Sequence, residues 1–287
     1  MQPAFPRSRS PVRRPLALVA LAGALAAAAP VASAQETTDF IKPGEDTLTL
    51  NLGAIVNNFS TSVRFDGNGT RGSDLDLEGN GLAKTRTSLY ASGTWRFLPN
   101  HRIDAQYWNA HRSGTKEVGH DVVIDGNVVP LGVSLSVDNR TQFFTADYRY
   151  SFVRNESVEV AGALGLYGGQ FKYDISATGS DGHAVVSGSK TASTTVPLPL
   201  IGVTVDWYPQ PRWRVSGDVT GMKARIGDVD GSVLLAAAST DYMLTRNIGI
   251  GARYMYSDVS ATVTKSSFNG ELTFRTNAIS VYAKLMY

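Results

Sequence analysis

Apolar and polar residues alternate along much of this chain with a period of two. In residues 279–287, Ile279, Val281 and Leu285 fall on one face of an extended strand, and Ser280 and Lys284 fall on the other. This alternation is typical of a β-strand with one apolar face, and a helical period is hard to find in the same chain. The sequence therefore predicts an all-β protein.

The alternation recurs in ten segments, which predicts an antiparallel up-and-down transmembrane β-barrel of about ten strands. Eight or twelve strands stay open as alternatives, because the links near residues 117–130 and 181–190 have room for another hairpin. The predicted strands are 47–57, 83–97, 101–113, 134–152, 157–176, 190–208, 212–225, 231–244, 247–260 and 270–287.

The links between these strands alternate in length. Residues 98–100 and 209–211 form tight turns, whereas residues 58–82 and 114–133 form long links rich in Gly, Asn and Asp. The link at 226–230 breaks the rule because it is short. Tight turns at one end and longer polar loops at the other indicate a barrel inserted into a membrane from one side.

Residues 1–34 have the layout of a secretory signal peptide. Four Arg precede an apolar run at 16–29, and residues 32–34 are the small residues Ala-Ser-Ala of a cleavage site. An N-terminal anchor helix is the alternative. We expect residues 35–45 to form a periplasmic tail and residues 46–287 to form the barrel, after export through the secretory pathway to the outer membrane of a Gram-negative cell.

Composition excludes several classes of function. The chain has no Cys, so disulfides, Cys-ligated metals and thiol nucleophiles are excluded. Removing the four Arg of the signal peptide from 27 Lys and Arg leaves 23 basic residues against 25 acidic ones. The mature chain is then slightly acidic, which removes the compositional support for a nucleic-acid partner.

Charged residues occupy the polar face of the predicted strands at mid-strand positions. In a membrane barrel this face surrounds the lumen, so we expect the charges to form an internal network. A selective pore would carry a ring of one sign of charge. Because the two signs nearly balance, a salt-bridge plug is favoured over a narrow or gated conduit. The predicted lumen network is Arg96, Asp104, Asp147, Arg149, Glu159, Asp206, Arg214, Asp218, Asp241, Arg253 and Lys284.

Aromatic residues gather near the tight turns, where a bilayer would place its headgroup level. A soluble periplasmic barrel that binds a small ligand would show the same alternation with its apolar face turned inward, but would spread its aromatic residues along the strands. The predicted membrane-interface aromatics are Trp95, Phe97, Tyr150, Phe152, Trp207, Trp213 and Tyr242, with Tyr208 and Tyr287 close to the same end.

The last strand places Val281, Ala283, Leu285 and Tyr287 on its apolar face. A terminal aromatic residue after alternating apolar residues resembles the C-terminal assembly signal of bacterial outer-membrane barrels. Together with residues 95–97, 100–104, 112–114 and 197–200, this strand makes the chain resemble uncharacterised Gram-negative outer-membrane β-barrel proteins. The resemblance implies the fold and the location. The partners expected with it are outer-membrane lipid, lipopolysaccharide and the assembly machinery; the surface ligand is unknown.

Two enzyme classes offer weak matches. His111 and Ser113 share a strand face, a spacing similar to the His-x-Ser of outer-membrane lipid A deacylases, and Glu117 could orient the base. Omptin proteases use acid pairs with a histidine, and only His120-Asp121 and Asp181-Gly182-His183 match loosely.

An acidic stretch, Asp74, Asp76 and Glu78, could hold Ca²⁺ but lacks a calcium-loop spacing, so a solvated loop is expected. We predict no catalytic residue, metal site or cofactor. The predicted function is a non-enzymatic barrel with a structural or surface-interaction role, or a narrow conduit for small solutes. The alternative is a barrel enzyme acting on lipid A or surface peptides.

Overall fold

The computed structural model describes residues 41–67, 69–180, 185–265 and 268–287. Among these residues the secondary structure is entirely β, and no helix is long and apolar enough to cross a membrane. The predicted signal peptide lies outside the described residues. The strands are β1 (Leu48–Phe65), β2 (Leu75–Asp76), β3 (Thr85–Leu98), β4 (His101–Glu117), β5 (Val122–Ile124), β6 (Asn127–Val129), β7 (Ser134–Arg154), β8 (Val158–Ser180), β9 (Val185–Gln210), β10 (Trp213–Ile226), β11 (Val229–Met243), β12 (Ile248–Lys265) and β13 (Phe268–Met286).

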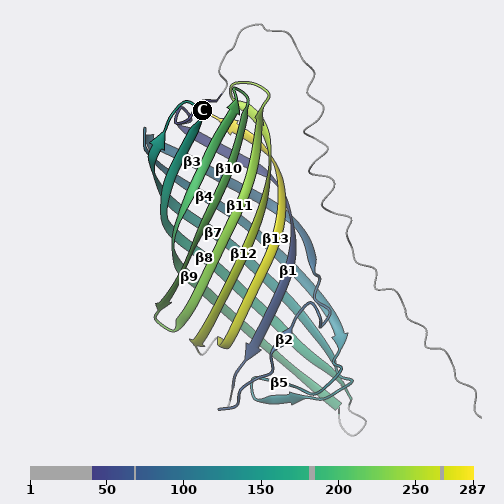
Figure 1. The fold of residues 1–287 in the computed structure, drawn as a ribbon. Helices are drawn as coiled ribbons and strands as arrows, with labels where there is room; N and C mark the ends of the chain where they lie inside the picture. Colours follow the sequence, from purple (N-terminus) through teal and green to yellow (C-terminus); the bar gives the residue numbers. More distant parts are fainter. Residues whose placement is uncertain (1–40, 68, 181–184, 266–267) are drawn as a thin grey trace, which may run out of the picture. The chain divides into compact units, whose positions relative to one another are not determined.

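All of these strands except β5 and β6 belong to one antiparallel sheet that closes on itself (Figure 1). Neighbours along the chain pair in order from β3 to β13, apart from the short β5–β6 hairpin, and β13 pairs with β1 to complete the ring. Within the described residues, ten strands make the ring once the two-residue β2 is set aside. The predicted up-and-down barrel of ten strands is confirmed.

The outward face near the tight turns is largely apolar. On β1, Leu48, Leu50 and Leu52 are exposed, and on β13 Ile279 and Val281 are exposed. These positions face away from the lumen because successive side chains of a strand point to opposite faces. We call the apolar outward residues of this half the lipid belt. With Leu and Val outside and charged residues inside, the arrangement is that of a membrane barrel rather than a soluble one.

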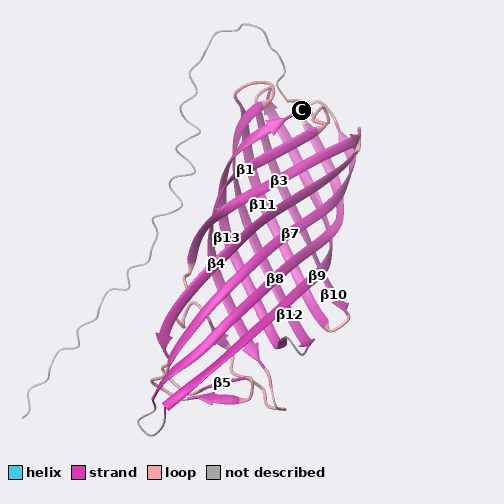
Figure 2. Cartoon of the chain, turned by 180° about the vertical axis from the view of Figure 1, so that it is seen from behind, coloured by secondary structure: helices cyan, strands magenta, loops and turns pink. Residues whose placement is uncertain are grey.

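Several strands continue well beyond the lipid belt. The last large apolar outward residue on β8 is Leu166, yet the strand runs on to Ser180. The predicted polar loop at 177–189 is therefore largely strand, and the predicted link at 261–269 is largely the hairpin of β12 and β13. Figure 2 shows these long strands from behind, with β5 beside their outer ends.

The pairing between β9 and β10 covers only part of β9. β10 pairs with β9 only from Ile201 to Gln210, so the outer half of β9 pairs with β8 alone among the described residues. Pro197 and Pro199 lie where the pairing with β10 stops. Proline lacks a backbone N–H, so it is suited to a strand whose edge is free.

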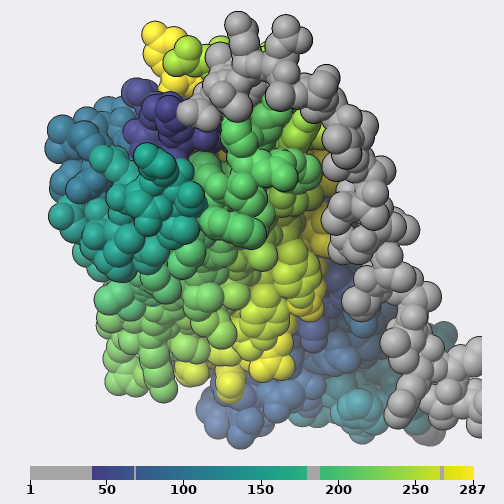
Figure 3. Space-filling view, turned by 45° about the horizontal axis from the view of Figure 1, so that its top comes forward, coloured from purple at the N-terminus to yellow at the C-terminus, as the bar shows by residue number. Residues whose placement is uncertain are grey.

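The start of the described chain packs against the turn end of the barrel. Ile41 is buried against Tyr208 and Met243, and its backbone N–H donates to the Pro211 carbonyl over 3.0 Å. The space-filling view from this end shows these first residues, in purple, among the short turns (Figure 3). Tyr208 therefore faces inward, and its expected place at the membrane interface is wrong.

Candidate functional site

The lumen at the turn end contains a layer of buried ion pairs. Glu159 is fully buried and receives both Nη1 and Nη2 of Arg96, each over 3.0 Å. Arg102 joins this pair to Asp206, with its Nη1 3.4 Å from Glu159 and its Nη2 2.9 Å from Asp206. A two-pronged guanidinium contact of this kind fixes the geometry of both groups.

Asp206 is the centre of this layer. Besides Arg102, it accepts from Nη2 of Arg214 over 2.9 Å and from the Ser216 hydroxyl over 2.6 Å. Asp206 and Ser216 are direct cross-strand partners on β9 and β10, and Arg214 shares the inward face of β10 with Ser216. The strand period alone thus brings the donors to one carboxylate.

Further ion pairs line the rest of the same half of the lumen. Arg149 lies 2.8 Å from Asp104 and 3.6 Å from Asp147. Arg253 contacts Asp218 over 2.7 Å and Lys284 contacts Asp241 over 2.5 Å. All eleven residues of the predicted lumen network are placed on the inward face, and every one of them is in an ion pair with another charged residue.

The sequence interpretation omitted four charged lumen residues. Arg102 lies two residues from Asp104 and so shares its face, a signal that was available. Asp46 contacts Arg96 over 3.4 Å from the segment before β1. Glu78 accepts from Arg112 over 2.5 Å and from the Thr61 backbone over 2.6 Å. The expected solvated loop is therefore wrong for Glu78, although Asp74 is exposed.

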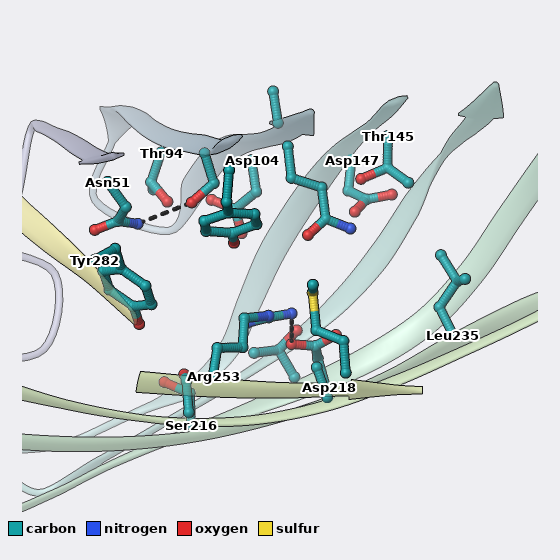
Figure 4. Close-up of a pocket in the computed structure, with 18 of the residues that line it drawn as sticks. Asn51, Thr94, Asp104, Thr145, Asp147, Ser216, Asp218, Leu235, Arg253 and Tyr282 are labelled. Atoms are coloured by element: carbon teal, nitrogen blue, oxygen red, sulfur yellow. Dashed lines mark hydrogen bonds and ion pairs between the residues drawn. The ribbon is translucent and has the colours of Figure 1, made fainter. Parts of the chain in front are cut away.

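A small polar cavity lies beside the charged layer, at mid-barrel (Figure 4). Its volume is about 100 Å³. Both side-chain amide atoms of Asn57 and one carboxylate oxygen each of Asp104 and Asp147 are buried there without a hydrogen-bond partner. A polar cavity with unpaired groups is the kind that holds ordered water, and a volume of about 10–15 Å³ is the least that can hold one molecule.

The outer half of the lumen is filled with apolar side chains. Phe59 lies 6.2 Å from Trp108 and 5.7 Å from Phe274 between ring centroids. Trp108 stacks on Phe143 at 5.1 Å. The guanidinium of Arg112 lies 4.0 Å above the ring of Phe59, in cation–π geometry. The lumen is thus occupied on both sides of the cavity, by charges at the turn end and by aromatic rings at the other.

The predicted interface aromatics lie on the outer surface near the tight turns. Trp95 and Phe97 contact each other at 5.5 Å, and Trp213 contacts Tyr242 at 4.9 Å. Amphipathic rings at this level are typical of the edge of a bilayer. The exposed members are Trp95, Phe97, Tyr150, Phe152, Trp207 and Trp213, and Tyr242 is partly exposed.

The residues of the predicted assembly signal close the ring. Val281, Ala283 and Leu285 face outward on β13 and pair with Ala54, Leu52 and Leu50 of β1. The backbone N–H of Tyr287 donates to the Leu48 carbonyl over 2.8 Å. β13 therefore closes the barrel by pairing with β1, and it also contributes part of the lipid belt.

The candidate catalytic residues do not assemble into a site. His111 and Ser113 are exposed on the outer surface, and Nε2 of His111 lies 2.5 Å from Asp138 rather than near Glu117. Asp121 accepts a backbone N–H from Leu131. The predicted pair Asp181 and His183 lies outside the described residues. Within the described ranges, no group of three His, Asp or Glu could hold a metal ion.

Comparison with known proteins rests on structure alone. No family model matches the chain, and no curated protein matches its sequence. The outer membrane protease OmpT from Escherichia coli superposes with a TM-score of 0.58 and 10% identity, covering 86% of this chain and 98% of that one. The fold is that of the Gram-negative outer-membrane β-barrels.

Two further solved structures are similar to this chain at lower TM-scores. The outer membrane protein OprG from Pseudomonas aeruginosa matches with a TM-score of 0.32 and 13% identity, over 85% of this chain and 98% of that one. Neisserial surface protein A matches with a TM-score of 0.31 and 12% identity, over 83% and 97%. The OmpT likeness shows the fold and carries no activity across.

Proposed function

We propose that this protein is a closed, non-enzymatic outer-membrane barrel that acts at the cell surface. The observation that carries the proposal is the filled lumen. Ion pairs around Glu159 and Asp206 occupy one half, and aromatic rings around Phe59 occupy the other. The cavity between them, at about 100 Å³, has room for several water molecules.

The part of the barrel beyond the lipid belt supports a surface role. β7, β8 and β9 continue past the belt as a sheet, and the hairpin of β5 and β6 lies near it. Loops and strands held on a rigid scaffold outside the membrane are the usual place for contacts with other molecules. We expect these contacts on the outer sheet. The lipid belt holds the barrel in the bilayer, and the charged layer fills the lumen at the turn end.

Conductance across a planar bilayer tests the closed lumen. Native protein, with insertion verified by heat-modifiable migration on a gel, should give no steady current. Steady open currents comparable to those of a large porin would overturn the plug and favour the conduit.

Labelling of intact cells tests the surface role. Because the chain has no native Cys, Asn127→Cys in the β5–β6 hairpin and Asn155→Cys in a tight turn form a matched pair. A membrane-impermeant maleimide should label Asn127→Cys and leave Asn155→Cys unlabelled. Labelling in the opposite pattern would reverse the orientation, and equal labelling would contradict a membrane barrel.

Mass spectrometry of lipid A tests the enzyme alternative. His111 is the base of the His-x-Ser hypothesis, and it is exposed on the outer surface in contact with Asp138. A deletion strain should have an unchanged lipid A profile. A profile that changes on deletion and is restored by the native protein but not by His111→Ala would establish the hydrolase instead.

A further inference from the structure

Three basic side chains form a row on the outer surface of β4, β7 and β8. The strand register places His111 directly opposite Arg140, and Arg140 directly opposite Lys172. All three side chains are about half exposed. Cross-strand partners on one face have Cβ atoms about 4.5–5.5 Å apart, so the like charges of Arg140 and Lys172 repel each other. Such a row is stabilised by an anion that bridges it. We call these three residues the basic row.

The basic row lies just beyond the lipid belt. On β7, Phe144 is the last apolar outward residue, Gln142 follows, and Arg140 is the next outward residue. Four residues of a tilted strand rise by about 10 Å, which carries Arg140 from the hydrocarbon edge to the outer side of the headgroup region. Long basic side chains can also reach back toward the membrane surface.

Two carboxylates hold the basic side chains from the side away from the membrane. Asp138 lies 2.5 Å from His111 and 3.5 Å from Arg140. Asp174 lies 3.5 Å from Lys172 and accepts a hydrogen bond from Thr191 over 2.7 Å. Asp138 and Asp174 are themselves cross-strand partners, one position farther out on each strand face. The basic groups therefore lie nearer to the membrane than the acids that orient them.

A hollow beside the row has the lining that an anion needs. Arg140, Lys172 and Lys265 contribute three cations, and Gln142 and Gln170 contribute amides. Ser193, Thr194 and Thr195 add hydroxyl groups, and none of the described lining residues is a carboxylate. Guanidinium, ammonium and amide N–H groups together favour phosphate, which accepts several charge-assisted hydrogen bonds.

We propose that the basic row binds the phosphate groups of lipid A in the outer leaflet. The position of the row fixes the source of the phosphate, because the row adjoins the lipid belt and faces the headgroups rather than open solvent. The site anchors a phosphorylated glycolipid to the β4–β7–β8 face of the barrel. It goes beyond the proposed surface function and does not depend on what the outer loops contact.

The test is the thermal stability of the detergent-solubilised protein as lipid A is added. Arg140→Gln with Lys172→Gln removes two charges of the row, and both side chains are exposed outside the lipid belt, so folding should be retained. We expect bisphosphorylated lipid A to raise the melting temperature of the native protein. The half-saturating concentration should rise at least tenfold in the double variant and by an intermediate factor in Lys172→Gln alone.

Arg275→Gln is the matched control. Arg275 lies on β13 at the same spacing from the belt, after Ile279 and Asn277, and its side chain is similarly exposed. Its cross-strand partners are Ser60 and Asp258, so no second cation lies beside it. The half-saturating concentration for this variant should equal that of the native protein.

Three results would overturn the proposal. The first is an equal half-saturating concentration for the double variant and Arg275→Gln. The second is equal stabilisation by lipid A whose phosphates have been removed, since the acyl chains alone would then account for binding. The third is equal stabilisation by inorganic phosphate at the same concentration, which would make the row a free-anion site.

Discussion

Loss of the negative charge at Asp206 should destabilise the barrel strongly. Asp206→Asn keeps the shape of the side chain but leaves Arg102 and Arg214 facing a neutral amide at a fully buried position. Arg102 keeps its contact with Glu159 over 3.4 Å, whereas Asp206 is the only carboxylate within ion-pair distance of Arg214 among the described residues. Breaking a buried pair by removing one partner costs about 3–5 kcal/mol, so we expect the free energy of unfolding to fall by that amount.

The assay is reversible urea unfolding in phospholipid vesicles, followed by the fluorescence of the four Trp residues. Asp258→Asn is the control, because Asp258 pairs with Arg275 over 2.8 Å on the exposed outer surface. An exposed pair contributes about 0.2–1 kcal/mol, so the control should change little. If Asp206→Asn lowers the free energy of unfolding by no more than Asp258→Asn, the charged layer is not a structural plug.

Two further predictions concern the belt and the outer sheet. Val281→Arg places a charge in the middle of the belt and should reduce the folded fraction on a heat-modifiability gel, at a cost of about 2–4 kcal/mol, whereas Asn277→Arg just beyond the belt should not. The hydrogen bond from the Thr191 hydroxyl and the charge of Lys172 lower the pKa of Asp174. The ionised Asp174 therefore stabilises the fold above the ordinary Asp pKa, and this stabilisation is lost as the pH falls through the lowered pKa of Asp174. Thr191→Val should raise the pKa of Asp174 in a carboxylate NMR titration; an unchanged value would contradict the assignment.

The strand order and the side of the sheet on which each charged residue lies can both be predicted from the sequence. A period of two fixes which residues share a face, and the tight turns fix which strands pair. Arg96, Arg149 and Asp241 were assigned to the lumen on this ground alone, and the structure places them there. Their partners could not be assigned in the same way. Arg96 and Glu159 lie on strands that are not neighbours in the sheet, so their contact depends on the curvature of the closed barrel.

The strand ends were predicted less well, and the reason lies in the alternation itself. β1 was expected to end near residue 57, but it continues to Phe65. Beyond Asn57 the outward residues are polar, as at Asn58 and Ser60, and the inward residues are apolar, as at Phe59. The strand predicted from apolar outward residues therefore ends at this change of polarity, although the backbone stays extended.

This change of polarity marks the outer edge of the membrane on each long strand. On β13 the inward residues are Lys284 and Ser280 inside the belt, then Phe274 and Leu272 beyond it, while the outward residues change from Val281 to Arg275. Lipid surrounds the first part, so apolar side chains face out and ion pairs fill the lumen. Water surrounds the second part, so apolar side chains turn inward and form a core. One strand therefore serves a membrane barrel at one end and a soluble barrel at the other. The apolar core of the outer part fills the lumen beyond the lipid belt.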